Sequence, residues 1–187
     1  REGILITVFT YLPYLYKKHS SVVIGFCGGT GAGKSTLVAY VTEILGNEKA
    51  IVLAQDHYYK HLPELSFEER SEINFDHPNA LDLELLAKHI KALQNGNAIK
   101  RPVYSFEQHL RVEETVTHNP NAYILVEGIL IFAHKPLHDL FDYKVYIEAD
   151  KEKRFQRRLE RDINTRGRTA EEVQERFNSS LHAMHNQ

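Results

Sequence analysis

The run "GGTGAGKST", residues 28–36, limits the fold of this chain more than any other feature. It matches the pattern G-x-x-x-x-G-K-[ST] between an apolar segment, "VVIGFC", and an amphipathic one, Ser35 to Leu45. Glycines in such a loop let backbone N–H groups face phosphate oxygens, the lysine bridges the outer phosphates, and the hydroxyl can ligate Mg²⁺. The sequence therefore predicts a strand–loop–helix unit that binds a nucleoside triphosphate. The predicted binding residues are Gly28, Gly29, Thr30, Gly31, Ala32, Gly33, Lys34, Ser35 and Thr36.

Short β-branched runs alternate with amphipathic helical stretches along the rest of the chain. The alternation predicts an α/β fold of the P-loop NTPase type, with a parallel sheet covered by helices on both faces. Between Ile99 and Thr117 two polar-aromatic runs predict a small β-hairpin standing off this sheet. Predicted strands are 22–27, 50–54, 122–128 and 143–149, and predicted helices are 35–45, 82–93, 150–161 and 169 to near the end.

Composition narrows the class of protein. A chain of 187 residues, 42% of them hydrophobic, suits one domain with its own core, and a formal net charge of −2 excludes a general basic surface for nucleic acid or membranes. The single cysteine, Cys27, excludes an internal disulfide framework, so we expect a reducing, cytoplasmic location. Residues 1–21 form an apolar N-terminal extension whose apolar run, Ile4 to Tyr16, is too short to span a bilayer, and we assign the extension no role.

Two acids stand where predicted strands end. Asp56 follows "VLAQ" and Glu127 closes "YILVE". The carboxyl ends of parallel strands meet at the edge where such sheets bind ligands. A carboxylate there can orient a hydroxyl and accept its proton, or hold Mg²⁺. We therefore take Asp56 as the candidate base and Ser35, Glu127 and Asp56 as candidate metal ligands; N-capping by Asp56 and a merely solvated Glu127 are the alternatives.

Six segments in matching order from Val22 to Met184 resemble the uridine kinase (uridine-cytidine kinase) family of P-loop kinases. They are "GGTGAGKST", "QDHYYK", "FEERSEINFDHPNALD", "RPVYSFEQHLR", "VEGIL" and "RRLERDINTRGR". The resemblance implies transfer of the γ-phosphoryl group of ATP or GTP to the 5′-hydroxyl of uridine or cytidine, giving UMP and CMP in pyrimidine salvage. It also implies that Asp56 is the base, that Mg²⁺ is the cofactor, and that the chain forms a homotetramer. From the net charge we expect no nucleic acid or membrane partner.

The nucleoside site is predicted from an acid and a group of aromatics. Asp76 stands in a Pro-bounded loop, where a carboxylate can accept hydrogen bonds from two ribose hydroxyls. Tyr104, Phe106 and His109 offer ring faces to a pyrimidine and an imidazole to its edge. The resemblance assigns the sugar to Asp76 and the base to the other three, and adds Tyr59 beside the acceptor. The residues alone leave open a turn-capping Asp76, aromatics that belong to the core, and Tyr58 in place of Tyr59.

Arginines crowd the segment 154–168. They suit the charge of a transferring phosphoryl group, and we predict an arginine-rich helical lid over about 154–176; a solvated, salt-bridged helix face is the alternative. The resemblance assigns Arg161 and Arg166 to phosphates beside Lys34, and Arg158 and Arg168 to the nucleoside.

The chain also departs from the family pattern. Arg176 stands before Phe177 where relatives often carry glutamine, which puts a sugar contact from that position in doubt. We expect the nucleoside kinase domain, residues 22–187, to lack a last strand and helix. Rival interpretations are a phosphoribulokinase-like or pantothenate kinase-like enzyme, or a nucleotide-binding module without catalysis.

Overall fold

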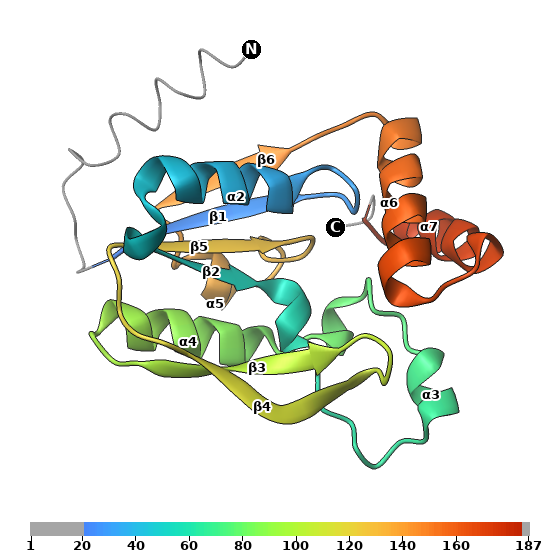
Figure 1. Ribbon diagram of the computed structural model, residues 1–187, viewed down its shortest axis with the longest axis horizontal. Coiled ribbons are helices and arrows are strands. Elements are labelled where there is room, and N and C mark those ends of the chain that lie inside the picture. Colours follow the sequence, from blue (N-terminus) through green and yellow to red (C-terminus); the bar gives the residue numbers. More distant parts are fainter. Residues whose placement is uncertain (1–20, 185–187) are drawn as a thin grey trace.

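A four-stranded parallel sheet forms the centre of the chain, with strand order β2-β5-β1-β6 (Figure 1). The computed structural model describes residues 21–184, so the apolar extension lies outside the described residues except for Ser21. The strands are β1 (Val22–Gly28), β2 (Ala50–Ala54), β5 (Tyr123–Gly128) and β6 (Tyr143–Ile147). The predicted parallel α/β architecture is confirmed.

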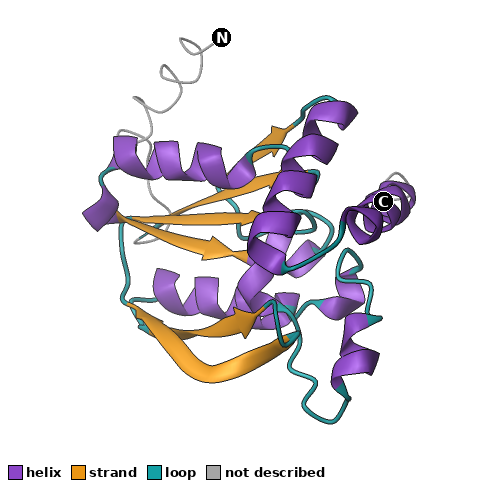
Figure 2. Cartoon of the chain, turned by 45° about the vertical axis from the view of Figure 1, so that its right-hand side comes forward, coloured by secondary structure: helices purple, strands orange, loops and turns teal. Residues whose placement is uncertain are grey.

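Helices cover both faces of this sheet, α2 on one and α4 with α5 on the other (Figures 1 and 2). The α-helices are α2 (Lys34–Leu45), α3 (Phe67–Ser71), α4 (Leu83–Gln94), α5 (Lys135–His138), α6 (Lys151–Arg166) and α7 (Ala170–Met184). Short 3₁₀ turns are η2 (Asn47–Lys49), η3 (Gln55–Tyr58) and η4 (Pro78–Ala80). No helix within residues 21–184 has both the length and the apolar character needed to cross a membrane.

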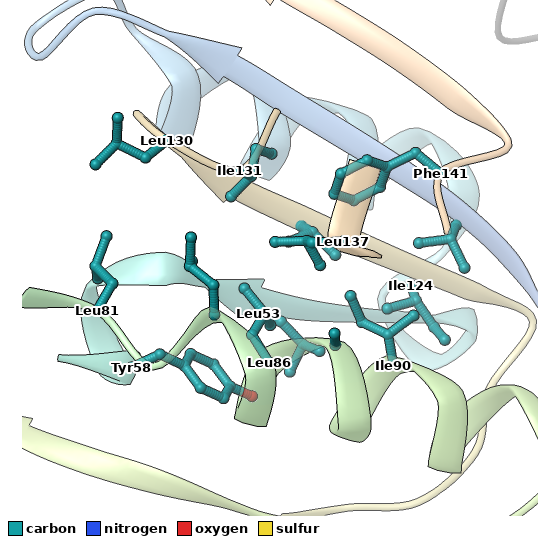
Figure 3. Close-up of a cluster of buried hydrophobic side chains, with 14 of the residues drawn as sticks. Leu53, Tyr58, Leu81, Leu86, Ile90, Ile124, Leu130, Ile131, Leu137 and Phe141 are labelled. Atoms are coloured by element: carbon teal, nitrogen blue, oxygen red, sulfur yellow. The ribbon is translucent and has the colours of Figure 1, made fainter. Parts of the chain in front are cut away.

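Side chains alternate between the two faces because the strand period is two residues. Ile24, Phe26 and Leu125 pack against α2, whereas Val23 and Ile124 belong to the larger core beneath α4 and α5. Figure 3 shows that larger core, with helix side chains facing strand side chains. The central strands β1 and β5 are therefore buried on both sides, as their nearly continuous apolar sequences predict, whereas the outer strands β2 and β6 have exposed positions.

The register fixes which residues share the open edge of the sheet. Glu127 of β5 lies level with Phe26 of β1 and Ala54 of β2. The residues that follow these three positions, including the phosphate loop and Asp56, consequently leave the sheet at the same edge. The arginine-rich helix α6 and the following helix α7 stand at this edge (Figure 1).

The hairpin is formed by β3 (Ile99–Ser105) and β4 (Leu110–His118), apart from the main sheet. Arg111 joins it to the body of the chain, because its guanidinium donates to the carbonyls of Tyr58 and Tyr59 and pairs with Asp82 at 3.3 Å. Asp82 also caps α4 through Leu85 N–H. The hairpin is thereby tied to the segment that carries Asp56.

Helix α6 is longer than predicted, ending at Arg166 and not at Arg161. Its last turn is stabilised by Asp162, which pairs with Arg158 one turn before and Arg166 one turn after. Gly167 then ends the helix in the left-handed conformation, φ 62°.

Strand β6 is shorter than predicted, since it ends at Ile147 and not at Ala149. The capping boxes Ser66–Glu69 and Thr169–Glu172 are both present.

Replacing Leu86 by alanine should destabilise the fold strongly. Leu86 is fully buried in α4, in the same cluster as Leu53 and Tyr58. The truncation removes buried methyl groups and leaves a cavity, so we expect a loss of about 2–5 kcal/mol in the free energy of unfolding. Urea unfolding at equilibrium measures this loss. Lys88→Ala, on the exposed face of the same helix, is the control and should change the value by less than about 0.5 kcal/mol. Equal effects would contradict the assignment of the core.

Candidate active site

The loop between β1 and α2 has the backbone of a phosphate cradle. Gly31 and Gly33 adopt positive φ, 73° and 97°, which side chains other than glycine rarely adopt. A Cβ on Gly31 would lie 2.2 Å from the carbonyl oxygen of Arg154, so the close approach of α6 also requires a glycine there. The Lys34 ammonium is buried within the loop and donates to the carbonyls of Gly28 and Gly29 at 2.9 and 3.0 Å. Burial lowers its pKa.

Ser35 and Glu127 meet across the sheet edge. The Ser35 hydroxyl, in the first turn of α2, donates to Glu127 Oε1 at 2.7 Å. Burial raises the pKa of Glu127, while the hydrogen bond from Ser35 and the charge of Lys34 oppose that rise. These two side chains, together with Asp56, offer only hydroxyl and carboxylate oxygens. That donor set fits Mg²⁺, which takes one or two carboxylates and completes its shell with waters and substrate phosphates.

Asp56 lies directly after β2, in η3, and faces the same cavity. Its side chain is 39% exposed, and Oδ2 lies 3.2 Å from Nη2 of Arg166. The alternative N-capping role is not what the contacts show, since η3 begins after Ala54 and has no side-chain cap. The carboxylate is therefore open to a ligand on one side and paired with an arginine on the other.

Two adjoining cavities contain most of the predicted site. One, of about 550 Å³, is lined by the phosphate loop, Asp56 and Glu127. The other, of about 520 Å³, is lined by Tyr104, Phe106 and His109. Both are lined by one shared set of residues, Tyr59, Asp76, Arg158 and Arg166.

Aromatic rings form one wall of the second cavity. The Tyr59 ring lies 5.0 Å from that of Tyr104 and 5.1 Å from that of Phe75. His109 stacks on Phe75 at 4.9 Å and 20°. Phe106 follows the end of β3 and lies in the hairpin turn, so its ring reaches the cavity from the turn and not from a strand. Burial, reinforced by nearby arginines, lowers the pKa of His109 to about 4.

The neighbouring tyrosines have different environments. Tyr58 is fully buried, and its hydroxyl lies 3.0 Å from Nδ1 of His89. Tyr59 lines both cavities. The structure thus resolves the choice that the sequence left open in favour of Tyr59.

The arginines of α6 point toward the acids of the cavities. Arg158 pairs with Asp76 at 3.3 Å, as Arg166 does with Asp56, and Arg166 also lies 4.4 Å above the Phe106 ring. Arg161 lines the first cavity and Arg168 the second. The alternative of a solvated, salt-bridged helix face does not describe Arg158, which is 4% exposed and pairs with Asp76.

Several residues near the site escaped the sequence analysis. Asp162, with no exposed surface, contacts the arginines from behind, and its spacing of four residues from Arg158 and from Arg166 is the signal that could have found it. Phe75, just before Asp76, is marked only by its place in "NFDHP". Gln55 is buried and accepts a hydrogen bond from Leu130 N–H. No sequence pattern predicts this contact.

Arg176 lines the second cavity, and its guanidinium donates to the Ser71 carbonyl at 2.9 Å. Arg176 therefore links α7 to the last residue of α3. No sugar contact from this position is needed to explain its place.

Comparisons with known proteins agree with this geometry. The profile of the Phosphoribulokinase / Uridine kinase family matches residues 23–187. A uridine kinase of Clostridium perfringens is 42% identical over 166 residues, which are 89% of this chain and 80% of the relative. A uridine kinase of Staphylococcus haemolyticus is 41% identical over 168 residues, 90% of this chain and 81% of the relative.

Among solved structures, D-glycerate 3-kinase from Cryptococcus neoformans superimposes with a TM-score of 0.65 at 16% identity, covering 96% of this chain and 85% of that one. At this identity the likeness concerns the fold alone. The profile match and the two curated relatives carry the assignment further: this chain is a kinase that belongs to the Phosphoribulokinase / Uridine kinase family.

Proposed function

We propose that this protein transfers the γ-phosphoryl group of ATP or GTP to the 5′-hydroxyl of uridine and of cytidine, giving UMP and CMP. One observation supports this most directly. The cavity beside the phosphate loop and the aromatic cavity adjoin at Tyr59, Asp76, Arg158 and Arg166. A nucleoside in the second cavity can therefore present its 5′-hydroxyl to a triphosphate in the first.

Asp56 is the proposed base. It lies in the first cavity, and its exposed oxygens can orient the hydroxyl and accept its proton as the bond to phosphorus forms. Lys34, Arg161 and Arg166 supply positive charge toward the phosphates, where negative charge must be stabilised. Ser35, Glu127 and Asp56 would hold Mg²⁺, which when bound neutralises phosphate charge.

Asp76 is the proposed ribose ligand. Its carboxylate lies between the two cavities and is oriented by Arg158 at 3.3 Å. Two vicinal hydroxyls can both donate to one carboxylate, which fixes the sugar with its 5′ end toward Asp56.

The base pocket selects the acceptor. Tyr104 and Phe106 have their ring centroids 5.6 Å apart, and His109 borders the same cavity. Ring faces stack on a pyrimidine, and a neutral imidazole can donate to or accept from its edge. A sugar phosphate or pantothenate has no base to occupy this wall, so the aromatic cavity disfavours these acceptors. By resemblance to the uridine kinases we further propose a homotetramer that works in cytoplasmic pyrimidine salvage.

Asp56→Asn should lower kcat by on the order of a hundredfold or more, because the amide cannot accept the proton. ATP binding should survive, since the phosphate loop is unchanged. A coupled ADP-release assay and equilibrium titration with ATP measure the two quantities. Asp139→Asn, a surface carboxylate beside α5, is the matched control and should retain full turnover. Turnover near normal in Asp56→Asn would exclude Asp56 as the base.

Tyr104→Leu should raise KM for uridine by roughly tenfold or more while KM for ATP stays constant, because stacking on the base is lost but an apolar side chain is kept. Steady-state kinetics with each substrate varied in turn test this. Tyr104→Phe preserves the ring and should leave the uridine KM nearly unchanged. Equal increases for both substrates in Tyr104→Leu would mean that the hairpin is structural only.

The uridine KM should show no histidine titration between pH 6 and 8. With a pKa of about 4, His109 is neutral throughout this range and becomes protonated only at lower pH. The folded state favours the neutral ring, so any stability gained in this way is present above the ordinary histidine pKa and is lost as the pH falls toward 4. The pH profile of KM should run parallel to that of His109→Gln, which cannot titrate there. A break near pH 6.5 in the unmodified protein alone would contradict a neutral His109.

A further inference from the structure

Asp162 is a buried acid that is contacted by three arginines of α6 and by Arg168, which follows the helix. Its side chain has no exposed surface, and four guanidinium groups lie around it. Oδ1 is 2.8 Å from Arg161 and 3.6 Å from Nε of Arg166; Oδ2 is 3.2 Å from Nη1 of Arg168 and 3.5 Å from Nε of Arg158. Each oxygen is thus shared by two arginines.

Helical spacing and the turn after α6 bring these arginines to Asp162. Arg158 and Arg166 lie one helical turn before and after Asp162, on the same face of α6. Gly167 then turns the chain in the left-handed conformation, and its N–H donates to the Asp162 carbonyl. Arg168 N–H donates to the same carbonyl at 3.2 Å, which returns the Arg168 side chain to the carboxylate. The helix end is folded around this one residue.

Two of the arginines continue from Asp162 to the acids of the cavities. Arg166 connects Asp162 to Asp56, and Arg158 connects Asp162 to Asp76. The candidate base and the candidate ribose ligand are therefore each held by an arginine whose other contact is the same buried carboxylate.

Asp162 is ionised in this environment. Burial alone raises its pKa, but the charges of the arginines, led by Arg161, bring the pKa below the ordinary value. Without the negative charge, four guanidinium groups would lie close together and repel one another. Arginine side chains also have many rotamers. Without the Asp162 charge, the guanidinium groups would therefore spread over several orientations.

We propose that Asp162 is a positioning residue for phosphoryl transfer: it touches no substrate, and it holds Arg166 and Arg158 in the orientation that the reaction and the nucleoside require. The inference rests on the proposed function of these arginines. The alternative is that Asp162 only stabilises the end of α6. A purely structural role predicts that correctly folded molecules of an Asp162 variant keep normal kinetics, whereas a positioning role predicts that they do not.

Asp162→Asn keeps the shape and removes the charge. We expect kcat per nucleotide-binding site to fall by roughly ten- to a hundredfold, because misplacement of charged groups at the reacting centre is that costly. KM for uridine should rise as well, through Arg158 and Asp76. Sites are counted by ATP titration and assays run well below the unfolding temperature, so loss of folded protein cannot mimic the effect. Normal kcat per site would overturn the proposal.

Double-mutant cycles separate positioning from stability. If Asp162 acts through Arg166, adding Asp162→Asn to Arg166→Met should lower kcat little further, whereas independent effects multiply. A second cycle with Arg158→Met, read in the uridine KM, should behave in the same way. Multiplicative effects in both cycles would overturn the proposal. Should Asp162→Asn fail to fold, Asp162→Glu keeps the charge but displaces the carboxylate, and the same non-additivity is expected.

The single variants distinguish a failure of the proposed arginine roles from a failure of the positioning role of Asp162. Normal turnover in Arg166→Met, together with normal uridine KM in Arg158→Met, would refute the proposed roles of the arginines themselves. Impaired Arg166→Met with normal Asp162→Asn would refute only the positioning role of Asp162. Asp139→Asn, which removes a surface carboxylate, is the control and should match the unmodified protein throughout.

Discussion

Parallel pairing of β2, β5 and β1 is the constraint on which the rest of the structure depends. It sets Ala54, Glu127 and Phe26 level with one another, so that three chain segments leave the sheet at one edge. The hydrogen bond of 2.7 Å between Ser35 and Glu127 is a direct consequence, joining residues 92 positions apart in the sequence. A kinase needs phosphates, metal ligands and base within a few ångströms of each other, and the topology of the sheet supplies this proximity.

Different elements around this sheet line the two cavities of the proposed site. The phosphate loop and the start of α2 line the cavity proposed for the nucleotide, whereas the hairpin turn and the loop around Asp76 line the cavity proposed for the acceptor. Arg111 links these parts, because it holds the backbone of Tyr58 and Tyr59 and also Asp82 at the start of α4. The fold by itself does not select an acceptor. We propose that selection depends on the aromatic cavity, whose rings come from three separate segments of the chain.

Charge at the site is balanced in layers. Asp56 and Asp76 form the front layer, Arg166 and Arg158 the middle one, and Asp162 the rear. A buried ion pair is expensive to desolvate, and removing one partner leaves an uncompensated charge. Each member of these chains has an oppositely charged partner, while the Asp56 side chain stays 39% exposed and open to a ligand. This gives a physical reason for concentrating so many arginines in a slightly acidic chain.

The sequence by itself determined the phosphate loop, the parallel α/β class, the hairpin and both capping boxes, because these depend on local backbone preferences and on hydrophobic period. It also indicated which acids end strands, and the structure brings those acids to the cavities, although their roles stay predictions. Tertiary structure alone decided that Tyr59 and not Tyr58 faces the site, that Phe106 enters from a turn, and that Phe75 completes the wall. It likewise decided that Asp162 is fully buried, although the four-residue spacing of Asp162 from Arg158 and from Arg166 is a local signal of their pairing. The places of Tyr59 and Phe75 depend on packing between segments far apart in the sequence, which no local pattern encodes.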